Sequence, residues 1–140
     1  RMVAAKNVGS GVGALRQIYF ARLDLAYHAP GAEKDTDAIA EELHPITGFE
    51  FAVDTHFQAG FGHLFGYDAG YYGYMWSKVY GDDMFARFEA AGIDDAATGS
   101  DYRRLILERG GSVDGDTLVR DFLGREPDKG AFLRDLGLTE

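Results

Sequence analysis

The sequence contains no cysteine, which excludes disulfide bonds, a thiolate nucleophile and any cysteine-ligated zinc or iron–sulfur centre. Basic residues are also few: 14 Lys and Arg stand against 23 Asp and Glu, and the formal net charge is −9. A chain of this charge repels phosphate backbones and anionic lipid headgroups. No uncharged run is long enough to span a bilayer. We therefore expect neither a nucleic-acid partner nor a membrane partner.

The ends and the length of the chain set further expectations. The first residues, RMVAAKNVGSG, show neither a basic start followed by an apolar stretch nor a small-residue cleavage site, so we predict no signal peptide and a cytoplasmic location. The 140 residues are close to the usual size of one domain, and we expect residues 1–140 to form a single helical domain. A start at Arg1 also suggests a piece of a longer protein.

Apolar residues that recur every three or four positions predict an all-α fold, and no segment alternates convincingly with period two. Caps, glycines and prolines limit the predicted helices to residues 12–28, 36–43, 68–91 and 100–109, a helix opened by Ser112 or Asp114 and ended by Gly124, and a short helix from Pro127 onward. Ser100 is the predicted cap of the fourth helix, and Thr36 or Asp37 that of the second. Residues 48–70 show no clean period but are rich in glycine and aromatic residues, which predicts an ordered, partly buried loop.

A helix that begins near residue 68 would carry two distinct stripes. One stripe bears three phenols and an ammonium group: Tyr67, Tyr71, Tyr74 and Lys78. The other is expected to face the core: Tyr72, Met75, Trp76 and Val79. Phenols that face a cleft can donate hydrogen bonds to a carbonyl oxygen as it gains negative charge. From the pattern alone, however, tyrosines that simply fill a helix interface are the commoner case.

The spacing of the four histidines does not fit a metal site. His28, His44, His56 and His63 are separated by 16, 12 and 7 residues, and no H-E-x-x-H string occurs. We therefore predict that this chain holds no metal by itself. His28 also follows Asp24 at a spacing of four, which we interpret as a helix-surface ion pair rather than a buried orienting pair.

Three strings occur in an order that resembles a known family. They are F-G-H-L-F-G-Y-D-A-G-Y-Y-G-Y-M-W-S-K-V-Y at residues 61–80, Y-R-R-L-I-L-E-R-G-G-S-V-D at 102–114, and F-L-G-R-E-P-D-K-G-A-F-L-R-D-L-G-L at 122–138. Together they resemble the C-terminal part of the thimet oligopeptidase family, the zinc oligopeptidases of peptidase family M3. The resemblance runs from about residue 15 to residue 138, nearly the whole chain.

The resemblance implies a compact helical C-terminal lobe of a zincin-type oligopeptidase that acts on short peptides. In that family the zinc-binding helix and the third zinc ligand lie upstream of the strings found here. Zinc is therefore expected in the full-length enzyme and not on this chain, whose partner would be the upstream zinc-binding lobe of the same polypeptide. The chain alone should be inactive, and apolar faces meant for that lobe should lead it to self-associate.

The same resemblance assigns roles to residues of the glycine-rich segment. Tyr74 takes the place of the tyrosine that stabilises the oxyanion, and the substrate-binding places fall to His63, Gly66, Tyr67 and Tyr71. The sequence departs from the family in having one glycine, Gly66, where two are typical, and in having Lys78 where an acidic residue is more usual. The alternative is a non-catalytic helical module whose aromatic groove binds a peptide or a partner helix.

Overall fold

The computed structural model describes residues 5, 8–31 and 33–138. Over these residues the chain is helical and contains no strand, which confirms the all-α prediction. The chain divides into two compact units, residues 1–75 and 76–140. The single domain expected from the sequence stays a prediction. No helix in the described ranges has the length and apolar character needed to cross a membrane.

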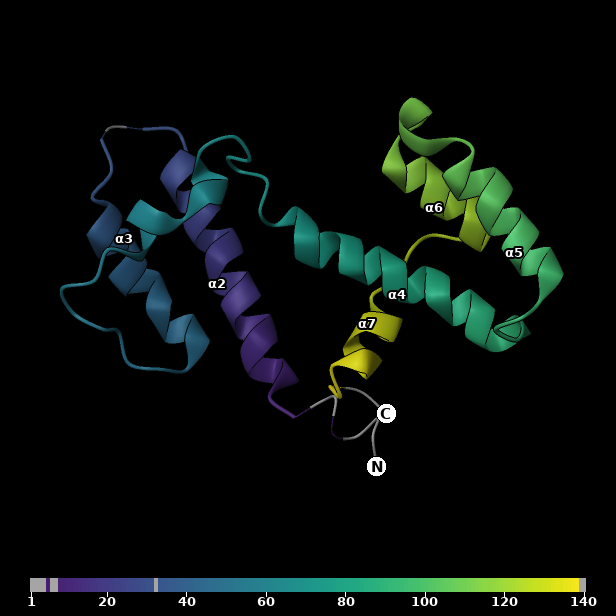
Figure 1. Cartoon of the computed structure of the whole chain (residues 1–140), viewed down its shortest axis with the longest axis horizontal. Helices are drawn as coiled ribbons and strands as arrows, with labels where there is room; N and C mark the ends of the chain where they lie inside the picture. Colours follow the sequence, from purple (N-terminus) through teal and green to yellow (C-terminus); the bar gives the residue numbers. More distant parts are fainter. Residues whose placement is uncertain (1–4, 6–7, 32, 139–140) are drawn as a thin grey trace. The chain divides into compact units, whose positions relative to one another are not determined.

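The first unit is built on one long helix and an irregular segment. Figure 1 shows α2 lying beside α3, with the irregular segment following. Its elements are α2 (Ser10–His28), α3 (Thr36–Leu43) and the 3₁₀ turns η1 (His44–Thr47), η2 (Phe57–Gly60) and η3 (Gly62–Leu64). The buried apolar core joins α2, α3 and the irregular segment through Tyr19, Phe20, Ala21, Leu23, Ala40, Phe61 and Tyr71. The ordered, partly buried loop predicted for residues 48–70 is therefore confirmed.

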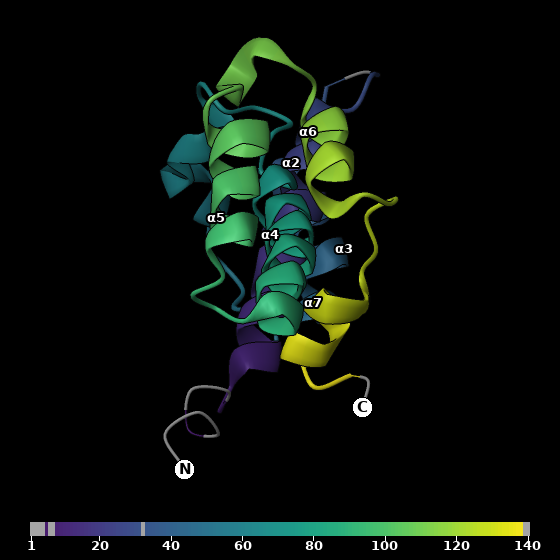
Figure 2. The same ribbon diagram turned by 90° about the vertical axis from the view of Figure 1, so that its right-hand side faces the viewer.

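The second unit packs helices around one buried phenylalanine. Its elements are α4 (Gly73–Ala91), which begins in the first unit, α5 (Ala96–Tyr102), the π-helical turn η4 (Arg103–Leu107), η5 (Gly110–Ser112), α6 (Gly115–Leu123) and α7 (Gly130–Asp135). Figure 2 shows α5 and α6 on either side of α4. The ring of Phe122 on α6 is fully buried, 5.9 Å from Phe88 on α4 and 5.6 Å from Tyr102 on α5. Three helices thus share one aromatic contact.

Several predicted helix starts are wrong, and the caps explain why. Asp95 accepts a hydrogen bond from the backbone N–H of Thr98, so α5 begins at Ala96 and not at Ser100. In the same way Asp35, rather than Thr36 or Asp37, caps α3. The last helix begins at Gly130, three residues beyond Pro127.

The long helix α4 begins at Gly73 instead of near residue 68, and this changes which side chains are buried. Ala69 has a left-handed φ of 55°, which a helix cannot contain. The apolar stripe predicted to face the core is wrong for its two largest aromatic members, because Tyr72 is 49% exposed and Trp76 57% exposed. Tyr71 is buried instead.

A buried carboxylate on α4 holds the segment between α6 and α7 in place within the second unit. Asp83 is almost fully buried and accepts hydrogen bonds from Arg125, at 2.5 and 2.8 Å, and from the Asp128 backbone N–H at 2.8 Å. Burial alone would raise the pKa of Asp83, but these hydrogen bonds outweigh it and hold the pKa below its ordinary value. The sequence analysis did not single out Asp83.

We expect Asp83→Asn to lower the free energy of unfolding by about 1–3 kcal/mol at pH 7, because the amide loses a charged acceptor while Arg125 can still be hydrated. Since the folded-state pKa is lowered, this contribution is present above the unfolded-state pKa of about 4 and disappears as the pH falls through the folded value. Urea unfolding at pH 7 and pH 3 measures it. Asp121→Asn, which removes an exposed partner of Arg109, is the control and should cost under about 1 kcal/mol.

Candidate functional site

A fully buried carboxylate on α2 holds the glycine-rich segment in place. Asp24 Oδ1 accepts the backbone N–H of Ala69 at 3.0 Å, and Oδ2 accepts that of Tyr71 at 2.9 Å. His28 lies one turn further along α2, with Nδ1 3.0 Å from Asp24 Oδ1. The interpretation of Asp24 and His28 as a surface ion pair is therefore wrong. Only Asp24 is fully buried, His28 is partly exposed, and the carboxylate binds a backbone turn 45 residues away in sequence.

The turn that Asp24 binds depends on a glycine and positions one tyrosine. A Cβ atom at Gly70 would lie 3.1 Å from the Tyr67 carbonyl oxygen and 3.1 Å from its ring, closer than ordinary contact. Tyr71, next in the chain, is buried, and its hydroxyl donates a hydrogen bond to Gln17 Oε1 at 2.8 Å. Both the backbone and the side chain of Tyr71 are thus held by α2.

Around Tyr71 the structure gathers one imidazole and two further phenols. The His63 ring centroid is 5.1 Å from that of Tyr71, 6.2 Å from Tyr67 and 5.8 Å from Tyr74. His63 Nε2 lies 3.2 Å from the Tyr74 hydroxyl oxygen, within hydrogen-bond distance. Tyr74, in the first turn of α4, is 52% exposed. The structure therefore brings together His63, Tyr67, Tyr71 and Tyr74, although three of them precede the helix.

Three of these side chains, those of His63, Tyr67 and Tyr71, line an open groove with a volume of about 740 Å³. His63, Gly66, Tyr67 and Tyr71, the four residues predicted to bind substrate, all line it. The groove is also lined by Arg16 and Phe20 of α2 and by Phe57 and Phe61 of the irregular segment. The groove is mostly apolar, with ring edges, a guanidinium and glycine backbone along it. Tyr74 reaches this group through its contact with His63.

Lys78 does not belong with these phenols. Its ammonium group donates hydrogen bonds to Asp82 and Asp135, both at 2.7 Å, and lies 5.5 Å from the centre of the Phe132 ring. Partial burial alone would lower the pKa of Lys78, but the two hydrogen bonds outweigh it and raise the pKa. The predicted common stripe with Tyr67 and Tyr71 is wrong because α4 starts only at Gly73.

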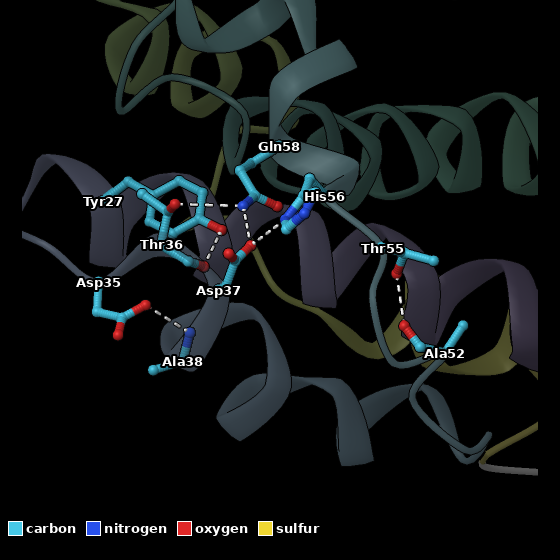
Figure 3. Close-up of polar contacts among 9 residues, drawn as sticks. All are labelled: Tyr27, Asp35, Thr36, Asp37, Ala38, Ala52, Thr55, His56 and Gln58. Atoms are coloured by element: carbon cyan, nitrogen blue, oxygen red, sulfur yellow. Dashed lines mark hydrogen bonds and ion pairs between the residues drawn. The ribbon is translucent and has the colours of Figure 1, made fainter.

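A second polar cluster, which the sequence analysis missed, fixes the loop before the groove to the start of α3 (Figure 3). His56 Nδ1 lies 2.9 Å from Asp37 Oδ1, and Gln58 Nε2 donates to the same oxygen at 2.5 Å and to Thr36 Oγ1 at 3.2 Å. The hydrogen bond to Asp37 raises the pKa of His56, and the hydrogen bond from His56 lowers that of Asp37. The only sequence signal was a histidine and a glutamine two residues apart in a loop rich in glycine and aromatic residues.

Zinc, which the sequence resemblance implies for a full-length enzyme, has no ligand set among the described side chains. Over residues 5, 8–31 and 33–138, no three His, Asp or Glu side chains come together in a way that could hold a metal ion. The described residues therefore do not fit a zinc site.

Comparison with known proteins gives the family. The family model described as peptidase family M3 matches residues 1–138. The chain belongs to peptidase family M3. Over 144 residues it is 38% identical to Oligopeptidase A of Escherichia coli (strain K12), covering 99% of this chain and 21% of that protein. It is 32% identical over 152 residues to Saccharolysin of Saccharomyces cerevisiae, with 98% and 20% covered. It is 34% identical over 148 residues to the "Probable cytosolic oligopeptidase A" of Arabidopsis thaliana, with 99% and 21% covered.

These matches confirm the family resemblance noted in the sequence. The chain spans about a fifth of the length of the M3 relatives it matches. What a whole M3 peptidase does is therefore considered for this chain only as a proposal.

We expect Asp24→Asn to loosen the turn at Ala69 and Tyr71, because an amide keeps one acceptor oxygen and turns an N–H₂ group toward a backbone donor. Hydrogen exchange of those two amides, followed by NMR, should accelerate by roughly tenfold or more.

Asp83→Asn is the matched control, since it changes an equally buried aspartate in the second unit. It should leave exchange at Ala69 and Tyr71 unchanged. Equal acceleration by both variants would mean that Asp24 acts only on global stability and does not hold the turn.

Proposed function

We propose that this chain is the substrate-binding and oxyanion-stabilising C-terminal part of a zinc-dependent M3 oligopeptidase that hydrolyses short peptides. The observation that carries the proposal is the hydrogen-bond contact between His63 Nε2 and the Tyr74 hydroxyl beside a groove lined by the predicted binding residues. The M3 family match supports the reaction class.

Tyr74 is the proposed oxyanion donor because its hydroxyl can accept one hydrogen bond and donate another. In the tautomer with the proton on Nε2, His63 donates to the Tyr74 oxygen. The phenol proton is then directed away from the imidazole and toward a bound group. A donor held in this way stabilises negative charge on a carbonyl oxygen without having to reorient during the reaction.

The proposed binding residues supply the walls of the groove. His63, Tyr67 and Tyr71 present ring faces and edges, and Gly66 leaves the backbone uncovered where a peptide would approach. The buried Tyr71 hydroxyl stays with Gln17, so Tyr71 contributes its ring. Peptide side chains would then contact aromatic surface while the peptide backbone finds the exposed polar atoms.

The remaining parts of the proposal lie outside the described residues. Zinc would be held by an upstream lobe of the same polypeptide, which we propose as the partner of this chain. A cytoplasmic location is supported by one relative whose name includes "cytosolic".

In the full-length peptidase that contains this chain, we expect Tyr74→Phe to lower kcat by about 100- to 1,000-fold while changing KM little, because the lost hydrogen bond exists chiefly in the transition state. Steady-state kinetics on a quenched fluorescent peptide measures both constants.

Tyr72→Phe is the matched control: it makes the same chemical change two residues earlier, at similar exposure, on a hydroxyl without a hydrogen-bond partner among the described residues. Its kinetics should resemble those of the unmodified enzyme. An increase in KM alone for Tyr74→Phe, or equal losses of kcat in both variants, would assign Tyr74 to binding or packing.

We expect the purified 140-residue chain to bind no stoichiometric zinc and to hydrolyse no peptide, because it lacks a cluster of metal ligands in its described part. Exposed apolar residues on α2, including Val12, Leu15, Ile18 and Leu25, should also cause it to self-associate. Metal analysis, a peptidase assay and sedimentation check these outcomes. Peptidase activity with bound zinc would show that the chain is not merely the C-terminal part of the site.

A further inference from the structure

A second cavity lies next to the groove and shares lining residues with it. Its volume is about 310 Å³, and its lining is mostly apolar. The aromatic residues around it are Tyr19, Phe20, His44, Phe49, Phe51 and Phe57. Three residues, Arg16, Phe20 and Phe57, line both this cavity and the groove. Phe20 and Phe57 are stacked, with ring centres 4.8 Å apart and planes 5° from parallel, so the two hollows share one thin wall.

Arg16 is the cation on that shared wall. Its guanidinium carbon lies 5.0 Å from the centre of the Phe20 ring. Within the part of the chain that the structure describes, no carboxylate forms an ion pair with Arg16, although the chain has more acidic than basic residues. Stacking on an aromatic ring leaves the edge of a guanidinium, where its N–H donors lie, open to a ligand.

We propose that the cavity takes the apolar side chain of a peptide's C-terminal residue while Arg16 binds the α-carboxylate of that residue. The inference rests on the proposed function, in which the groove holds the preceding peptide residues. It adds a side-chain preference and a requirement for a free carboxyl end. Glu50 also lines the cavity, so it opposes the carboxylate and favours an uncharged side chain in the cavity.

The cavity, Arg16 and the groove together suit one short peptide with a free carboxyl end. The volume lies at the lower end of the range for small-molecule pockets, which suits one large side chain rather than a longer segment. Aromatic walls favour an apolar or aromatic side chain. A guanidinium matches a carboxylate with two parallel N–H donors, and Arg16 lines both the cavity and the groove.

The test measures binding of N-acetyl-Ala-Ala-Phe to the 140-residue chain by NMR titration, beside the same peptide with a C-terminal amide. We expect the free acid to bind about three- to tenfold more tightly than the amide, the range for a partly exposed charged hydrogen bond. Arg16→Gln should remove this difference in affinity without weakening the binding of the amide. Arg22→Gln, the same change at an exposed position of α2 that lines neither hollow, should preserve it.

The side-chain half of the proposal has its own variant pair. Phe49→Ala shortens an exposed residue that lines the cavity and should weaken the binding of both peptides by about threefold or more. Phe85→Ala, at an exposed position of α4, should have no effect. Circular dichroism confirms that each variant is folded.

Three outcomes would each overturn the proposal. The first is equal binding of the acid and the amide, and the second is loss of binding of both peptides in Arg16→Gln. The third is an equal effect of Phe49→Ala and Phe85→Ala on binding. These are binding measurements, whereas the Tyr74 experiment measures turnover in the full-length enzyme. A failure of this cavity assignment therefore leaves the oxyanion role standing, and the reverse also holds.

Discussion

The Asp24 carboxylate is the interaction on which the groove depends. It accepts two backbone N–H groups of a segment that is neither helix nor strand, and such donors would otherwise be buried without partners. By fixing the backbone at Ala69 and Tyr71, it sets where the Tyr71 ring lies. That ring contacts Phe20, Phe61, His63 and Tyr74, so one buried carboxylate positions the ring around which these four aromatic groups gather.

Each unit of the chain is organised by one buried aspartate, and the two act differently. Asp24 binds backbone donors and a histidine on its own helix. Asp83 binds a guanidinium and a single backbone N–H. The first arrangement fixes the backbone of a loop, and the second holds the segment between α6 and α7 against α4. In both cases the carboxylate is needed because an irregular segment lies against a helix and cannot satisfy its own N–H groups.

Local sequence signals predicted the helices well and the buried polar contacts poorly. Periodicity together with glycine and proline stops identified α2, α3 and α6, because those signals act within a few residues. The shared position of His63, Tyr67, Tyr71 and Tyr74 also followed from the sequence, though for the wrong reason, since Tyr67 and Tyr71 precede α4. The burial of Asp24 could not be predicted, because its partners lie 45 and 47 residues away and an i, i+4 histidine offered a simpler explanation.

The same long separation constrains the order in which the first unit can fold. Contacts between residues so far apart form only after the intervening chain has closed into a loop, which is entropically costly. α2 and α3 are neighbours in sequence and can pair early, before residues 61–72 are in place. The groove is therefore a late-forming feature of its unit. During synthesis, a nascent chain that has reached α3 already contains Asp24. Some thirty more residues must be added before the backbone N–H groups that bind its carboxylate are present.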